Sequence, residues 1–181
     1  SQIVADGSGP LILTNVNNNL TTSPTGAKSL FLRGTSNFAN EITSNLTNDG
    51  GGGILSVVRD SAGTWILSGN NRYTGGTTLG LGTLGAGSDS AFGGFEGTPG
   101  NLSITNGTIF AAGADRTIRN PVVFSGTNST IAAFVGDYSL TFTGNWSDGT
   151  TTSTGRFLRN NIISGKTLTL SGNYIYNTVT S

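Results

Sequence analysis

The chain of 181 residues contains no cysteine, no histidine and no methionine. The absence of cysteine excludes a disulfide framework and a thiolate metal site, so the fold must depend on backbone hydrogen bonds and apolar packing. The absence of histidine also excludes Ser-His-Asp and Cys-His catalysis and ordinary zinc sites. Carboxylates are the acid–base groups that remain. We predict a protein that is not an enzyme and that carries no cofactor and no metal.

Charge is also scarce, because nine basic and nine acidic residues give a formal net charge of zero. Such a chain has no electrostatic field to attract nucleic acid or an anionic membrane. No apolar run approaches the roughly 18 residues needed to span a bilayer. No basic, apolar leader follows Ser1, so we interpret the chain as a processed or excised segment. We predict no nucleic-acid partner and no membrane span.

Small polar residues dominate the composition, since Gly, Asn, Ser and Thr supply 96 of the 181 residues. Leu, Ile, Val and Phe still make up about a quarter of the chain, above the threshold of roughly 20% below which chains are disordered. The chain therefore has enough apolar residues to fold. Few lysines and glutamates and no methionine are typical of a protein outside the cell, so we predict an extracellular location.

Short strands fit the whole chain, whereas Gly, Asn and Thr interrupt every window with helical apolar spacing. Strands of two to five residues with turn residues between them favour short faces joined at corners. We predict an all-β protein. The predicted strands cover residues 11–13, 30–32, 54–58, 65–67, 77–81, 102–104, 108–111, 121–124, 130–134, 140–143, 157–158, 168–170 and 174–176.

Four segments repeat an apolar strand followed by a glycine corner: LFLRGTSN (30–37), WILSGNN (65–71), LTFTGNW (140–146) and LTLSGNY (168–174). Such self-similarity is the signature of a solenoid. We expect the corner glycines to adopt positive φ and the asparagines that follow to stack into side-chain amide ladders. These corner residues are Gly34, Gly69, Asn70, Gly144, Asn145, Gly172 and Asn173.

The predicted fold is one parallel β-solenoid domain over residues 1–181, with about 20 residues and one roughly 4.8 Å step per turn, or about nine turns. The glycine-dense segments 48–53 and 82–100 are predicted to be loops, the second long enough to project from the coil. An antiparallel β-sandwich is the alternative, because Asn106-Gly107 between two alternating strands is a strong hairpin signal. The recurring Gly-Asn corner favours the solenoid.

Residues 63–84, GTWILSGNNRYTGGTTLGLGTL, resemble the autotransporter-associated β-strand repeat of bacterial passenger domains and large surface proteins. The resemblance implies a right-handed parallel β-helix, secretion across the bacterial envelope, and display at the cell surface or release. It implies no enzyme activity by itself. The residues that carry it are Gly63, Thr64, Trp65, Leu67, Ser68, Gly69, Asn70, Asn71, Tyr73, Thr74, Gly75, Gly76, Thr77, Thr78, Gly82, Thr83 and Leu84.

The leading functional hypothesis is a structural or adhesive surface protein. A β-helix exposes unpaired backbone at both ends, so copies of the chain are expected to associate head to tail into a fibre, residues 11–13 or the first residues meeting residues 174–179. Adhesion would make host or matrix glycans possible partners.

The second hypothesis is a carbohydrate-active or carbohydrate-binding module. It requires two of the scattered carboxylates, or a carboxylate with Arg116 or Arg119, to meet in a groove beside an exposed aromatic ring. The carboxylates are Asp6, Glu41, Asp49, Asp60, Asp89, Glu96, Asp115, Asp137 and Asp148.

Overall fold

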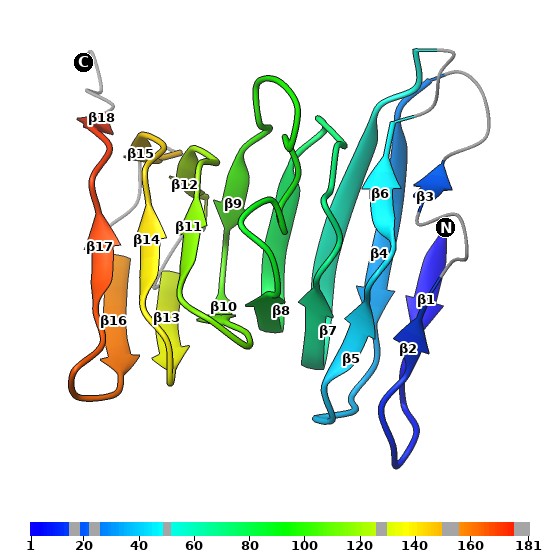
Figure 1. Ribbon diagram of the computed structural model, residues 1–181, viewed down its shortest axis with the longest axis horizontal. Helices are drawn as coiled ribbons and strands as arrows, with labels where there is room; N and C mark the ends of the chain where they lie inside the picture. The colour runs from blue at the N-terminus through cyan, green and yellow to red at the C-terminus, as the bar shows by residue number, and fades with distance from the viewer. Residues whose placement is uncertain (15–18, 22–25, 49–51, 126–129, 150–155, 176–181) are drawn as a thin grey trace.

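The computed structural model describes the chain except residues 15–18, 22–25, 49–51, 126–129, 150–155 and 176–181. Within the described residues there are 18 β-strands and no helix, and every strand pairing is parallel. The strands stack along the longest axis of the molecule, with the first and last turns at opposite ends (Figure 1). The prediction of an all-β parallel solenoid is therefore confirmed.

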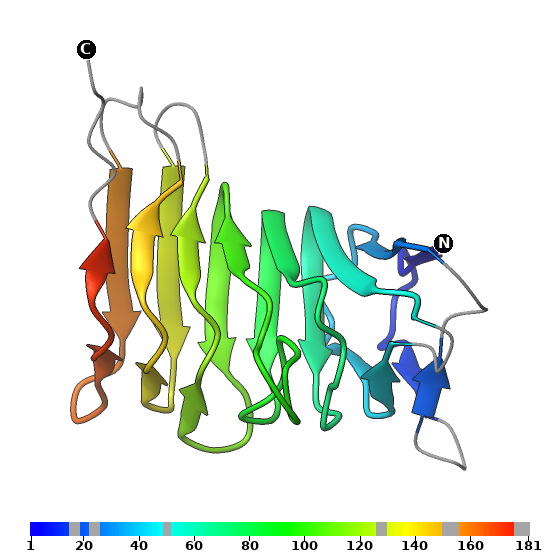
Figure 2. The ribbon, with the colours of Figure 1, turned by 90° about the horizontal axis from the view of Figure 1, so that it is seen from above.

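The strands form three stacks, and a turn normally adds one strand to each stack (Figure 2). The first stack contains β1 (Gln2–Val4), β4 (Lys28–Arg33), β7 (Leu55–Leu67), β8 (Thr77–Ala86), β9 (Leu102–Ile104), β12 (Val122–Phe124), β15 (Trp146–Asp148) and β18 (Tyr174–Ile175). The second contains β2 (Ile12–Leu13), β5 (Asn40–Ile42), β7, β8, β10 (Gly107–Ala111), β13 (Thr130–Gly136) and β16 (Arg156–Ile162). The third contains β3 (Asn19–Thr21) with β6 (Asn45–Thr47), and separately β11 (Arg116–Ile118), β14 (Leu140–Phe142) and β17 (Leu168–Leu170).

The turns are longer than the sequence suggested. Gln2 lies opposite Phe31, 29 residues later, while Val58 lies opposite Thr78, only 20 residues later. The turn of about 20 residues therefore applies to the repeat around residues 63–84 and not to the whole chain. The coil has fewer turns than the nine expected.

Apolar side chains point inward from successive turns and form one continuous core. In the first stack, Leu102 and Val122 lie opposite each other and both are buried. Phe134 and Phe142 pack edge to face inside the coil, with ring centroids 5.6 Å apart. Because each turn covers the apolar residues of the turn before it, stability accumulates along the axis.

The hairpin expected at Asn106-Gly107 is not formed. β9 and β10 flank this dipeptide, but β9 pairs with β8 and β12, while β10 pairs with β8 and β13. Gly107 has φ of 143° and turns the chain from one stack to the next. The alternative of an antiparallel sandwich is therefore wrong, since the same dipeptide serves as a corner between parallel stacks.

Other details of the sequence prediction also need correction. Predicted strands 54–58 and 65–67 are parts of one 13-residue strand, β7. Six strands were not predicted, namely β1, β3, β5, β6, β11 and β15. The glycine-dense segment 82–100 begins inside β8, and its loop folds back on the coil because Ala91 and Phe92 are fully buried. Of the predicted loop 48–53, residues 49–51 lie outside the described residues.

Candidate functional site

The repeat at residues 63–84 forms one complete turn of the coil. Trp65 of β7 lies opposite Leu84 of β8, one turn later, and both side chains are buried. Leu67, Asn71, Tyr73 and Thr77, which lie along the path between them, are buried as well. The motif is therefore a structural unit in which one turn of backbone wraps around its own large side chains.

The corner glycines are required by space and not, in most cases, by backbone conformation. Among the four, positive φ is found only at Gly34. A Cβ at Gly69 would lie 2.3 Å from the carbonyl oxygen of Ser44, and one at Gly144 would lie 2.3 Å from that of Asn120. At Gly172 the nearest atom would be the carbonyl oxygen of Gly144, at 2.1 Å. The expectation of positive φ was wrong for these three glycines, which let neighbouring turns touch backbone to backbone.

The asparagines beside these glycines connect one turn to the next, but not through paired side-chain amides. The backbone N–H of Asn70 donates to Oδ1 of Asn45 at 2.7 Å, and that of Asn173 donates to Oδ1 of Asn145 at 3.1 Å. Each bond joins a side chain to the backbone of a neighbouring turn. The predicted ladder therefore exists in a modified form that satisfies corner N–H groups.

Asn71 performs the same task inside the coil. Its Oδ1 accepts from the backbone N–H of Leu46 at 2.8 Å, and its Nδ2 donates to the carbonyl oxygen of Ala91 at 2.8 Å. The side chain is buried and links the turns on both sides of it. Such buried amides replace strand pairing at corners, where the backbone ladder is interrupted.

Tyr73 and Thr77 form a buried polar pair at the end of the repeat. The two hydroxyl oxygens are 2.6 Å apart, and the Thr77 hydroxyl also donates to the carbonyl oxygen of Phe92 at 3.3 Å. Between them, Gly75 and Gly76 pass close to the backbone of Leu55 and Asn101, respectively. Burial raises the pKa of the Tyr73 hydroxyl well above its usual range, and the Thr77 hydrogen bond opposes this shift only in part.

Tyr73 is expected to make the coil sensitive to alkali. Because its pKa is raised by folding, its contribution to stability is complete below the pKa of an unfolded tyrosine, about 10, and is lost as the pH rises further. Tyr73→Phe should lose about 1 kcal/mol at neutral pH, the value of one hydrogen bond. Melting temperatures measured from neutral to strongly alkaline pH should then fall less steeply for the variant. Parallel curves for both proteins would contradict this assignment.

Arg59 is a buried cation at the bend of β7, and the sequence analysis did not single it out. The pairing of β7 with β8 shifts register on both sides of Asp60. There the Arg59 guanidinium donates to the carbonyl oxygens of Leu32 at 3.1 Å and Gly63 at 2.8 Å, and also to that of Ala62. Burial lowers its pKa to about 10. The alternation of inward residues along 55–59 was the signal that placed this side chain in the core.

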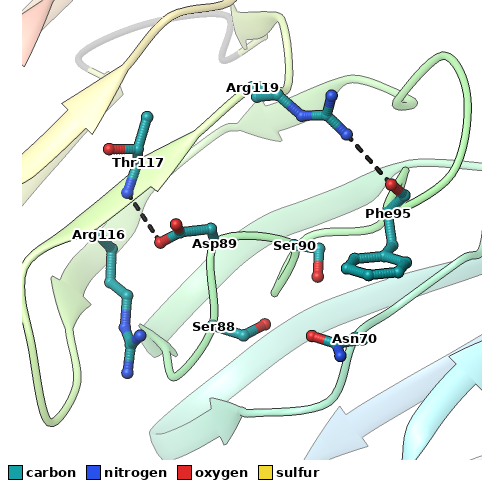
Figure 3. A pocket seen from close by; sticks show the side chains of 8 residues that line it. All are labelled: Asn70, Ser88, Asp89, Ser90, Phe95, Arg116, Thr117 and Arg119. Atoms are coloured by element: carbon teal, nitrogen blue, oxygen red, sulfur yellow. Dashed lines mark hydrogen bonds between the residues drawn. The ribbon is translucent and has the colours of Figure 1, made fainter.

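An open pocket of about 500 Å³ lies where the loop after β8 passes β11 (Figure 3). Its volume is within the range of small-molecule sites. Asn70 comes from the corner of the repeat, four residues come from the loop, and three come from β11 and the residue after it. The lining residues are Asn70, Ser88, Asp89, Ser90, Phe95, Arg116, Thr117 and Arg119.

Hydrogen bonds to backbone carbonyls hold both arginines of the pocket. Nη2 of Arg116 donates to the carbonyl oxygen of Ala112 at 2.8 Å. Nη2 of Arg119 donates to those of Gly94 at 2.9 Å and Phe95 at 3.3 Å. In the described part of the chain, neither guanidinium forms a salt bridge. Their positive charges are therefore fixed in place without being neutralised.

Asp89 is the single carboxylate of the pocket. Its Oδ1 accepts from the backbone N–H of Thr117 at 3.0 Å, so the loop is attached to β11 one turn further along (Figure 3). Phe95 lines the other side of the pocket and is 38% exposed. The pocket therefore combines a carboxylate, two arginines and an exposed ring, which is the combination that the second hypothesis requires.

Comparisons with protein-family models, with curated proteins and with solved structures give no significant match. The chemistry of the site is therefore the guide to function.

Most other carboxylates have structural partners. Arg33 binds Asp60 in a salt bridge, Arg72 binds Glu96 with N–O 3.0 Å, and Lys166 binds Asp115 with N–O 3.0 Å. The backbone N–H of Ser139 and the Lys166 ammonium lower the pKa of Asp115. No three acidic side chains come together as a possible metal site in the described residues, and no helix there is long and apolar enough to cross a membrane.

Proposed function

We propose that the chain is a structural or adhesive β-solenoid module of a secreted bacterial surface protein, and that copies of it associate end to end. The parallel coil supports this proposal, because it presents an extended surface and open sheet edges. The resemblance of residues 63–84 to passenger-domain repeats and the low charge of the chain support the extracellular setting. The state of the two ends is the observation that carries the proposal.

The end strands have neighbours on one side. In the described residues, β1 pairs with β4 and β2 with β5, while at the other end β16 pairs with β13 and β17 with β14. Their outer edges present backbone groups in the orientation that a further parallel strand would use. Neither end is covered by a helix in the part of the chain that the structure describes.

Apolar side chains are also uncovered at these ends. Ile12 of the first turn is 53% exposed, and Ile175 of the last turn is 49% exposed. Val4 in the first turn and Leu158 and Ile163 in the last are exposed too. In the middle of the coil the next turn covers such positions. The two ends therefore resemble an internal interface between turns that has been opened.

A second copy of the chain fits each end, because β18 and β1 occupy the same stack and run in the same direction. Adding β1 of one copy beyond β18 of another continues the parallel order of that stack. This contact joins two different surfaces, so it does not close on itself and a fibre grows. The predicted contact with residues 174–179 falls partly outside the described residues, since 176–179 are not described.

Lysine at an end turn is expected to block association. Ile175→Lys places a charge in the proposed contact and should weaken association about tenfold or more, the effect of about 1.4 kcal/mol. Leu81→Lys is the matched control, because Leu81 is similarly exposed but lies in the middle of the coil on β8. Sedimentation velocity over a concentration series and electron microscopy of the same samples provide the measurement. A wild-type protein that stays monomeric at all concentrations, or equal weakening by both variants, would contradict the proposal.

A further inference from the structure

We propose that the pocket between the loop after β8 and strand β11 binds an acidic saccharide, a sugar ring that carries a carboxylate. This site would supply the ligand of an adhesive module. It lies on the side of the coil and uses no residue of the end turns, so it does not depend on end-to-end association. The inference rests on the charges, the hydroxyl groups and the exposed ring that meet in this pocket.

The two guanidiniums make the pocket an acceptor for a carboxylate. Elsewhere Arg33, Arg72 and Lys166 each pair with an acidic side chain. Arg116 and Arg119 instead donate to backbone carbonyls, which orient a guanidinium but leave its charge uncompensated. A guanidinium has five N–H donors, so both retain donors for a ligand. A planar fork of this kind binds carboxylates through two parallel hydrogen bonds.

Asp89 distinguishes a sugar acid from a simple anion. Its side chain is exposed in the same pocket, where it would repel a small, densely charged ion such as phosphate. A carboxylate is, however, a strong acceptor for sugar hydroxyls. Ser88 and Asn70 add further groups that donate to or accept from hydroxyls. A ligand with one negative group and several hydroxyls therefore uses both signs of charge.

Phe95 provides an apolar surface for the face of a sugar ring. The guanidinium of Arg72 lies over the Phe95 ring, 5.1 Å from its centroid, and the salt bridge to Glu96 fixes Arg72 in turn. The carbonyl of Phe95 also accepts from Arg119. The aromatic ring is thus held from two sides while it remains partly exposed in the pocket (Figure 3). A fixed ring loses little entropy when a ligand packs on it.

The same inventory favours binding over cleavage. Glycosidases commonly use two carboxyl groups, one on each side of the scissile bond. This pocket has one carboxylate, which is attached to the Thr117 N–H. We therefore expect a saccharide to leave the pocket unchanged.

Calorimetric titration with digalacturonate tests the proposal, with its neutral methyl ester and inorganic phosphate as comparison ligands. We expect saturable binding of the acid, at least about tenfold weaker binding of the ester, and no stronger binding of phosphate, since a hydrogen bond between charged groups contributes about a factor of ten. Equal affinity for acid and ester would overturn the proposal, as would tighter binding of phosphate or no binding of the acid. Product analysis of the same mixtures checks that the acid is intact, and cleavage would overturn the assignment as a binding site.

Variants locate the binding. Arg119→Gln is expected to weaken digalacturonate binding about tenfold or more, whereas Arg159→Gln, which removes an exposed arginine of β16, should leave it unchanged. Arg119 also holds the loop, so Asp89→Asn provides a second test that keeps the oxygen facing Thr117. This variant should weaken the acid and favour phosphate relative to wild type. Equal losses from Arg119→Gln and Arg159→Gln, or an Asp89→Asn profile identical to wild type, would overturn the proposal. Sedimentation of the same variants keeps this result separate from end-to-end association.

Discussion

Gly69→Ala is expected to destabilise the coil by about 3 kcal/mol, the upper part of the range for added core atoms. The new Cβ would lie 2.3 Å from the oxygen and 2.7 Å from the carbon of the Ser44 carbonyl. Both atoms belong to the backbone, so no side-chain rotation relieves the contact, and the two turns have to separate. In an unfolded chain alanine has less conformational entropy than glycine and would by itself stabilise the fold. The clash has to exceed that gain.

Urea unfolding followed by circular dichroism measures this effect, and Gly7→Ala is the matched control. A Cβ at Gly7 has nothing within 4 Å, and Gly7 does not adopt positive φ. The control should be neutral or slightly stabilising. If both variants unfolded at the same urea concentration, backbone contact between turns would not be the reason for glycine at position 69.

Arg59→Met is expected to cost about 3 kcal/mol, because carbonyl oxygens buried without a donor cost about 1–3 kcal/mol each. Methionine fills a similar volume but donates no hydrogen bond to Leu32, Ala62 or Gly63. Removing a desolvated charge returns part of the loss, since burial already lowers the pKa of Arg59 to about 10. The bend of β7 is the segment that should loosen first.

Hydrogen exchange read by mass spectrometry, together with urea unfolding, checks this expectation. Arg159→Met serves as the control because its side chain is exposed. Faster exchange in Arg59→Met should begin around residues 59–64 and the strand segments paired with them. An Arg59→Met protein as stable as the control would mean that the guanidinium is not what holds the bend.

The sequence predicted the class of fold because the same corner occurs several times. Gly69-Asn70, Gly144-Asn145 and Gly172-Asn173 announce the corners, and the short apolar runs before them announce the strands. The reason for glycine was wrong, because the distance between one turn and the next is a property of the packed coil. A glycine in open space and a glycine against a backbone look identical in a sequence.

The site was not predictable to the same degree. Arg116 and Arg119 were considered beside scattered carboxylates, but their partner in the pocket, Asp89, lies 28 residues before Thr117, the residue that binds it. Turn length decides which residues meet, and it varies between 20 and 29 residues even along one stack. Strand β11 was missed because Arg116 and Thr117 are polar and only Ile118 is buried.

Because almost all pairing joins residues about one turn apart, the coil has no contact that waits for a distant part of the chain. Each completed turn offers a ready edge and a ready apolar floor for the next stretch of polypeptide, so closing a turn costs the entropy of a loop of only some 20 to 29 residues. Folding can therefore advance in order from a single seed, like a zip, while the remainder of the polypeptide is still extended. A chain threaded through a narrow channel one segment at a time could gain stability at every step of its emergence.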